Sequence, residues 1–208
     1  MVKLGELIRG RLVVCRVKTF IAVLAMATWL SGCVLSREPF YSADAIIEPL
    51  KLDGTWHLLD RQGAAEKNEY WEFKGNKALA FDERGQWRSF TVTYFNVDGV
   101  TFADTIPDGP GDDIASSEAY RSLHLVPYHM LSRVELAGDR FTLRPLLTRE
   151  FKEATKKKPV ATWSVQTDYE TYVFNASSAD WAAFLKKHGK DEGLFSEESK
   201  LVFVRQTE

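Results

Sequence analysis

Two cysteines and four histidines are the residues of this 208-residue chain whose side chains best suit nucleophilic or metal chemistry. Cys33 follows two small residues, Ser31 and Gly32, and a thiol in its thiolate form is a good nucleophile. No Gly-x-Ser-x-Gly, His-Glu-x-x-His or glycine-rich phosphate-binding pattern occurs in the sequence. We therefore expect no enzyme activity, with one alternative left open, a hydrolase built from residues that form no recognisable motif.

The histidines and the acidic loop offer little support for a metal or cofactor. His124 and His129 lie five residues apart around Pro127, so in a strand they would point to opposite faces. The acids of loop 107–113 lack the alternating spacing and final Glu of a calcium-binding EF-hand loop. We expect structural histidines, a solvated loop and no cofactor. A cleft in which His124 or His129 bonds a Ser or Asp would favour the hydrolase alternative.

An apolar run of 11 residues, Phe20 to Leu30, precedes Cys33. At about 1.5 Å per residue, a helix of this length is too short for a hydrocarbon core of about 30 Å. Five basic residues and one acid come before the run. A basic stretch, a short apolar stretch and then small residues are typical of a secretory signal peptide.

The end of this segment, Leu30-Ser31-Gly32-Cys33, resembles the lipobox of bacterial lipoproteins. The resemblance implies that residues 1–32 are a signal peptide, that cleavage falls between Gly32 and Cys33, and that Cys33 is acylated. Each buried methylene contributes about 0.8 kcal/mol, so several acyl chains hold a protein to a membrane. The residue after the cysteine is Val34 and not Asp, which in that family favours the periplasmic face of the outer membrane. We expect a protein of the bacterial cell envelope.

Without residues 1–32 the chain has 176 residues, enough for one domain with a real core. Subtracting the leader's five bases from 27 and its one acid from 29 leaves 22 and 28, a net charge of −6. This acidic balance argues against a nucleic-acid partner. Cys33 is the one cysteine left, so thiolate metal sites are not expected. Residues 33–50 are predicted to be the lipidated cysteine and a short tether, partly lying on a single domain at 51–208.

Short runs rich in aromatic and β-branched residues predict an antiparallel meander in the first half of the domain. Turn signals separate them at Gly75-Asn76, Arg84-Gly85 and Asp98-Gly99. The predicted strands are 68–74, 77–83, 86–97 and 100–106.

Two-residue turns at these sites place Phe73 opposite Ala78 and Phe95 opposite Phe102. Both faces then carry large apolar side chains, which fits a barrel but does not decide which face lies inside. One predicted face contains Leu79, Phe81, Phe90, Val92 and Tyr94, and the other contains Trp71, Phe73, Trp87, Phe95 and Phe102.

The run Asp53-Gly54-Thr55-Trp56 stands before the meander, and its Gly-x-Trp resembles the opening motif of lipocalins and related calycin barrels. The resemblance implies that Gly54 allows close backbone approach and that Trp56 plugs the closed end of a β-barrel. We expect a mainly β fold, an antiparallel meander closing into a lipocalin-like barrel.

The second half of the domain predicts further strands and two surface helices. A hairpin turns at Gly138-Asp139, with Arg133 opposite Arg144 and therefore either exposed or beside an acid. Helices are predicted near 147–158 and 178–188, the second capped by Ser177 or Ser178 and ended by Gly189. Strands are predicted at 130–136, 140–146, 160–167, 169–175 and 200–206.

Two functions remain open from the sequence. The first is a lipid-anchored barrel that binds a small apolar or amphipathic ligand among aromatic walls. The second is an envelope protein that docks on an outer-membrane or cell-wall assembly through an outer aromatic face. The candidate ligand-binding residues are Trp56, Trp71, Phe73, Trp87, Phe90, Tyr94, Phe95 and Phe102.

Overall fold

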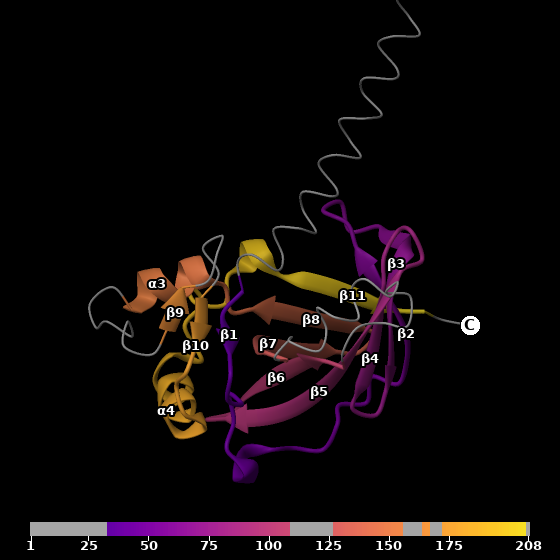
Figure 1. Ribbon diagram of the computed structural model, residues 1–208. Coiled ribbons are helices and arrows are strands. Elements are labelled where there is room, and N and C mark those ends of the chain that lie inside the picture. The colour runs from indigo at the N-terminus through magenta and orange to yellow at the C-terminus, as the bar shows by residue number, and fades with distance from the viewer. Residues whose placement is uncertain (1–32, 109–126, 156–163, 167–171, 207–208) are drawn as a thin grey trace, which may run out of the picture.

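The computed structural model describes residues 33–108, 127–155, 164–166 and 172–206, and its centre is an antiparallel β-barrel of eight strands. Each strand pairs with its neighbour along the barrel, and pairing of β6 with β7 completes the ring. Figure 1 views the barrel obliquely along its axis, with β11 and β8 above and β5 and β6 below. The strands are β2 (Gly54–Leu59), β3 (Ala65–Lys74), β4 (Lys77–Phe81), β5 (Trp87–Val97), β6 (Val100–Pro107), β7 (His129–Ala137), β8 (Arg140–Pro145) and β11 (Leu201–Arg205).

The barrel is the up-and-down meander that the turn signals predicted. From β2 to β8 every strand pairs with the next one in the chain, and β11 fills the gap between β8 and β2. A long insertion between β8 and β11 forms structure outside the barrel. The prediction of a mainly β barrel with two surface helices is confirmed.

Tight turns gather at one end of the barrel, which we call the closed end. The connections β3–β4, β5–β6 and β7–β8 each have two residues, because Lys74 pairs with Lys77, Val97 with Val100 and Ala137 with Arg140. These are the predicted turns, and the predicted register of each hairpin is confirmed. The β2–β3, β4–β5, β6–β7 and β8–β11 connections lie at the other end, which we call the open end.

The β4–β5 turn at the open end differs from the prediction by one residue. Phe81 pairs with Trp87, and Asp82 accepts hydrogen bonds from the amides of Arg84 and Gln86 through its carboxylate. The amide of Asp82 also donates to the carbonyl of Gln86 at 2.9 Å, which leaves Glu83, Arg84 and Gly85 (φ +71°) as a three-residue loop and not a two-residue turn at Arg84-Gly85. A one-residue shift exchanges the two faces of a strand, so the predicted grouping of residues on β4 and β5 is wrong.

A second layer covers one side of the barrel, at the left of Figure 1. The short strand β1 (Leu35–Ser36) pairs with β7 on one edge and with β10 (Tyr172–Phe174) on the other. The layer also contains η1 (Ala43–Ala45), α3 (Thr148–Thr155), β9 (Ser164–Gln166), α4 (Ser178–His188) and η4 (Glu197–Ser199). Among these described elements, no helix is long and apolar enough to cross a membrane.

The segment after Cys33 belongs to this layer and is not a tether over its first residues. Val34 and Phe40 are fully buried, and the amide of Val34 donates to the carbonyl of Leu146 at 2.9 Å. Phe40 packs on Trp181 of α4, with ring centroids 4.6 Å apart. The apolar residues of the segment therefore complete an outer core, as their composition partly indicated.

The helix α4 forms as its sequence predicts. Ser177 accepts from the amide of Asp180, whose carboxylate accepts from the amide of Ser177, a complete capping box. Gly189 follows the last residue as the C-terminal cap. The first predicted helix is described only over Thr148–Thr155, and its predicted last residues, 156–158, lie outside the described residues, as do residues 109–126 with His124.

Two separate apolar cores result from this arrangement. The inner core lies inside the barrel and takes buried side chains from all eight of its strands. The outer core lies between the barrel and the second layer and includes Phe95, Phe102, Leu131 and Trp181. The aromatic residues that the sequence placed on one sheet are therefore divided between an inside and an outside.

Candidate ligand-binding site in the barrel

The eight candidate ligand-binding residues do not share one face of the barrel. The inner core contains five of them. Phe95 and Phe102 are fully buried in the outer core, and Trp87 pairs with Phe81 on the outer face. The prediction that these last three share a face with Trp71 is wrong, because the extra residue in the β4–β5 loop inverts the register. The five residues inside the barrel are Trp56, Trp71, Phe73, Phe90 and Tyr94.

Trp56 occupies the closed end of the interior. Its side chain is fully buried, and its indole Nε1 donates to the carbonyl of Leu52 at 2.6 Å. Gly54 begins the strand with φ +115°, a conformation that L-residues with a side chain rarely adopt. The two residues of the Gly-x-Trp pattern therefore act together, since the glycine turns the chain into β2 and the tryptophan fills the barrel beneath it.

Arg205 completes this end of the barrel and was not among the residues predicted from the sequence to form the site. Its guanidinium carbon lies 4.4 Å from the ring centroid of Trp56, a cation–π contact. Its two terminal nitrogens donate to the carbonyls of Asp53 (2.6 Å) and Lys51 (2.7 Å). The signal was present in the last strand, where Leu201 and Phe203 point inward and alternation gives Arg205 the same side.

Above Trp56, aromatic rings pack against one another across the interior of the barrel. Phe141 lies against Trp56 and Phe203, with centroid separations of 5.9 Å and 5.7 Å. Phe73 meets Phe141 at 80°, an edge-to-face contact. All four side chains are at most 5 % exposed. They form a solid floor, defined as Trp56, Phe73, Phe141 and Phe203.

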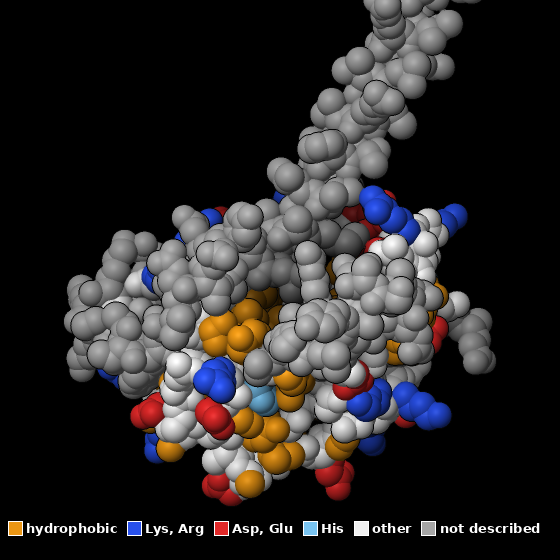
Figure 2. Space-filling model, in the orientation of Figure 1, with side chains coloured by type: hydrophobic (Ala, Val, Ile, Leu, Met, Phe, Trp, Pro, Cys, Tyr) orange, Lys and Arg blue, Asp and Glu red, His pale blue; other side chains and the backbone are white. Residues whose placement is uncertain are grey.

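The interior above this floor is less filled. Trp71 and Phe90 stack with an interplanar angle of 8° and a centroid distance of 5.9 Å, yet both are only half-buried. Small side chains face them from the wall, including Ala80, the strand partner of Trp71. Figure 2 shows hydrophobic side chains beside a hollow at the centre of the molecule, next to residues drawn in grey. Trp71 and Phe90 are therefore the inward-facing aromatic rings that keep partly accessible surface above the floor.

Tyr94 adds a polar group to the inner core. It is 2 % exposed, and burial raises the pKa of its phenol above the ordinary value. A buried neutral hydroxyl can donate to an acceptor oxygen, so the interior offers a hydrogen bond as well as apolar surface.

His129 forms a buried pair with Asp104 in the outer layer. His129 Nδ1 lies 2.8 Å from Asp104 Oδ1, and the amide of Phe40 donates to Asp104 Oδ2 at 3.0 Å. Burial raises the pKa of the Asp104 carboxyl, while the bond and charge of His129 and the amide of Phe40 lower it, with a net increase. The pair ties the N-terminal segment to β6 and β7, and such a role fits the structural histidine that the sequence predicted.

The His129–Asp104 pair also tests the hydrolase alternative, which requires a histidine bonded to a Ser or Asp in an accessible cleft. Ser36 is the strand partner of His129, but it is fully buried and its hydroxyl accepts from the indole of Trp181 at 2.9 Å. A substrate cannot reach a serine in this position. Among the described residues, no group of three or more His, Cys, Asp or Glu side chains is placed to hold a metal ion.

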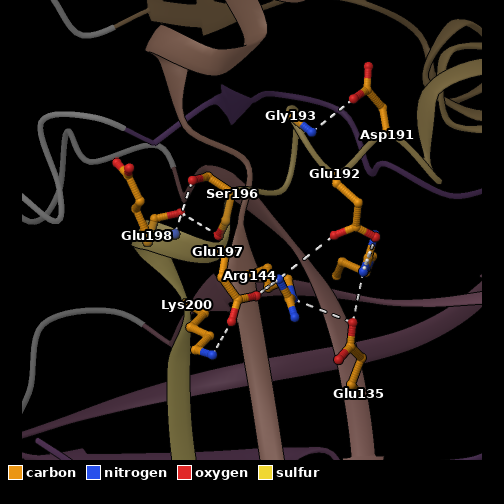
Figure 3. A network of polar contacts seen from close by, with 11 residues as sticks. Glu135, Arg144, Asp191, Glu192, Gly193, Ser196, Glu197, Glu198 and Lys200 are labelled. Atoms are coloured by element: carbon orange, nitrogen blue, oxygen red, sulfur yellow. Dashed lines mark hydrogen bonds and ion pairs between the residues drawn. The ribbon is translucent and has the colours of Figure 1, made fainter. Parts of the chain in front are cut away.

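The pair Arg133–Arg144 lies beside acids, as the sequence allowed. Figure 3 shows Arg144 among carboxylates of Glu135, Glu192 and Glu197. Arg133 bonds Glu135 and Glu192, each at 2.8 Å. The acids offset the repulsion of two opposed guanidinium groups and attach the 191–200 segment to the outside of β7 and β8.

Cys33 lies at the open end of the barrel wall. It forms an isolated antiparallel bridge with Leu147, two residues beyond the end of β8, and its carbonyl accepts from the hydroxyl of Thr148 at 3.1 Å. Burial raises the pKa of the thiol to about 11. Thr148 is the first residue of α3, so its hydroxyl joins the N-terminal segment to the helix.

The outer face of β2 to β5 carries a second group of accessible aromatic residues. Tyr70 and Phe81 stack at 4.5 Å and 11°, and Phe81 pairs with Trp87 in the next strand. All three are half-buried. The same face holds a hollow of about 740 Å³ whose lining includes Glu72, Lys77, Leu79 and Asp108.

Comparison with known proteins adds no family to these observations. No protein-family model matches the chain, and neither a curated protein nor a solved structure matches it. The assignment of the fold therefore rests on the strand pairing of the chain itself: it is a closed eight-stranded antiparallel barrel with an inner aromatic core.

Proposed function

We propose that this protein is a membrane-anchored lipoprotein of the bacterial envelope whose barrel binds a small apolar or amphipathic ligand. The observation that carries the binding role is the contrast inside the barrel. The floor side chains are buried, whereas Trp71 and Phe90 face inward above them and remain half-buried. Accessible aromatic surface in a concave site is the usual lining of a small-molecule pocket.

Anchoring through Cys33 supports the same function and follows from the lipobox resemblance. A thiol with a pKa of about 11 is a weak nucleophile at neutral pH, because little thiolate is present. Acylation would therefore take place before residues 34–36 dock on the barrel. Metabolic labelling with a palmitate analogue tests this step: wild type should be labelled and Cys33→Ser should not, and a labelled Cys33→Ser would contradict it.

Ligand binding is tested by filling the interior without removing a contact. Ala80→Phe adds a ring beside Trp71 on the inner face, whereas Leu79→Phe adds bulk to the outer face of the same strand. We expect wild type and Leu79→Phe to bind cis-parinaric acid, measured by its fluorescence, and Ala80→Phe to lose binding. Equal binding by both variants, or no binding by wild type, would reject a ligand site in the barrel.

The alternative function, docking on an envelope assembly, is favoured by the outer aromatic row Tyr70, Phe81 and Trp87. Trp and Tyr are enriched at interfaces because they combine a large apolar surface with a polar group. Trp87→Ser should then abolish co-sedimentation with isolated cell walls or outer membranes and leave cis-parinaric acid binding intact. If co-sedimentation is unchanged, the outer row is not a docking surface.

A further inference from the structure

No flexible residues separate the proposed lipid anchor from the barrel. Val34 is fully buried and hydrogen-bonded to Leu146, and Leu35 and Ser36 are paired on both sides. A flexible linker would let a domain rotate freely at some distance from the membrane. Here the acylated residue would be part of the folded wall, so the acyl chains restrict both the distance and the orientation of the barrel.

Cys33 lies at the open end and not at the closed end. Its bridge partner Leu147 follows the last residue of β8, Pro145, at the end where β7 begins with His129. The closed-end turn of the same strand, Gly138-Asp139, is separated from it by the six residues of β8. At about 3.3 Å per residue, the two ends of this strand are roughly 20 Å apart.

The charges around the open end are unequal. Beside Cys33, α3 exposes Arg149 and Lys152, and Arg149 is ion-paired with Glu150 of the same helix at 2.7 Å. On the opposite wall, β3 and the β4–β5 loop bring together Glu66, Glu69, Asp82 and Glu83; burial and these neighbouring carboxylates raise the pKa of Glu69. β4 is four strands from β8 in either direction round the barrel. The wall far from the anchor therefore carries crowded carboxylates that an anionic lipid surface would repel, whereas the wall beside the anchor carries both signs of charge.

We propose that the open end of the barrel rests on the membrane surface, tilted so that the wall of β8 and α3 lies nearest the headgroups, and that the ligand is a membrane-resident amphiphile exchanged directly with the bilayer. This inference rests on the proposed lipid anchor and barrel site. It adds to them the source of the ligand and the surface through which it passes. An apolar ligand entering by this route avoids a passage through bulk water.

The orientation is tested with full-length, processed protein on vesicles of phosphatidylethanolamine and phosphatidylglycerol that contain a headgroup-nitroxide phospholipid. Because acylation consumes Cys33, an introduced cysteine carries the only fluorophore. Arg149→Cys labels the open end of the β8 wall and Asp139→Cys labels its closed end. We expect strong quenching at position 149 and little at position 139. Equal quenching, or stronger quenching at position 139, would overturn the proposal.

A linker variant separates the role of the short connection from that of surface charge. A flexible Gly-Ser insertion between Cys33 and Val34 keeps the anchor but frees the barrel. The difference in quenching between positions 149 and 139 should disappear, and transfer of cis-parinaric acid from the vesicles to the barrel should slow. If the quenching difference and the transfer rate both stay unchanged, the connection does not set the orientation.

The outcomes distinguish the proposals from one another. Failure of the wild-type protein to float with the vesicles would reject the anchor. Flotation and oriented quenching without any uptake of cis-parinaric acid would reject the ligand site. Flotation and uptake with equal quenching at positions 149 and 139 would reject this inference alone.

Discussion

The two ends of the barrel are built from the same strands but on different principles. At the closed end, two-residue turns bring the strands together, and Trp56 and Arg205 seal the interior by packing and by hydrogen bonds to backbone carbonyls. At the open end the connections are longer, and Trp71 and Phe90 face inward without being fully covered. The interior is therefore tightly packed at one end and less filled at the other.

The largest expected effect separates the two ends directly. Trp56→Ala should lower the free energy of unfolding by about 3–5 kcal/mol, because it removes a fully buried ring and leaves a cavity. Trp71→Ala should cost roughly half as much, since its side chain is only partly buried. Urea denaturation of both variants measures the difference. Equal losses would mean that the open end is packed as firmly as the closed end.

A second change concerns the hydrogen bonds of the closed end. Arg205→Lys keeps the charge but loses the planar fork that reaches the carbonyls of Asp53 and Lys51. We expect a loss of about 1–2 kcal/mol in the same denaturation experiment, because a bidentate hydrogen bond from a charged donor to two exposed carbonyls is lost. Arg140→Lys, at an exposed position of β8, is the matched control and should leave stability unchanged.

The β4–β5 loop tests the open end. Gly85→Ala introduces a side chain at φ +71° and should cost about 1–2 kcal/mol of stability, because L-residues with a Cβ are strained in this region. A measured cost near zero would show that the loop relaxes into the two-residue turn. In that case the inner and outer faces of β4 would exchange, and a fluorophore at position 80 would become accessible to solvent quenchers.

The smallest expected effect depends on pH. Burial opposes ionisation of Asp108, but hydrogen bonds from Lys77, Ser89 and Thr91 outweigh it and lower the pKa of its carboxyl from 3.8 to about 2. A lowered pKa in the folded state gives stability that is present above about 4 and is lost as the pH falls through about 2. At this exposed site we expect about 1 kcal/mol or less, after allowing for solvent screening.

Asp108→Asn should lower stability at neutral pH by that amount and flatten the decline between pH 4 and pH 2, followed by thermal unfolding at each pH. A decline that remains as steep in the variant would assign it to other carboxylates. The control is Asp98→Asn, an acid in the closed-end turn at φ +50°, where Asn is also tolerated.

Local chemistry explains most of what could be predicted. Gly75-Asn76, Asp98-Gly99 and Gly138-Asp139 form their turns from their own backbone preferences, so the registers of these three hairpins follow from the sequence. The capping box of α4 is equally local. The Arg84-Gly85 turn failed because its geometry depends on Asp82, whose carboxylate accepts from two amides and selects the longer loop.

The candidate site was only partly predictable for a related reason. Residue type identified five candidates that lie inside the barrel, Trp56, Trp71, Phe73, Phe90 and Tyr94. In a strand with apolar residues on both faces, however, either face could be the inner one. Phe95 and Phe102 face outward and are covered by residues 34–41 and α4, which come from distant parts of the chain. A packing partner remote in sequence leaves no periodic signal near the residues it covers.

The sequence by itself determined the strand-rich composition, three hairpins, one capped helix and the expectation of an anchor at Cys33, because each depends on neighbouring residues. Only the tertiary structure decided which aromatic residues lie inside the barrel, that Arg205 seals its closed end, and that the chain beyond Cys33 is part of the wall at its open end. The last two features depend on contacts between residues more than a hundred positions apart, such as Arg205 with Asp53 and Thr148 with Cys33.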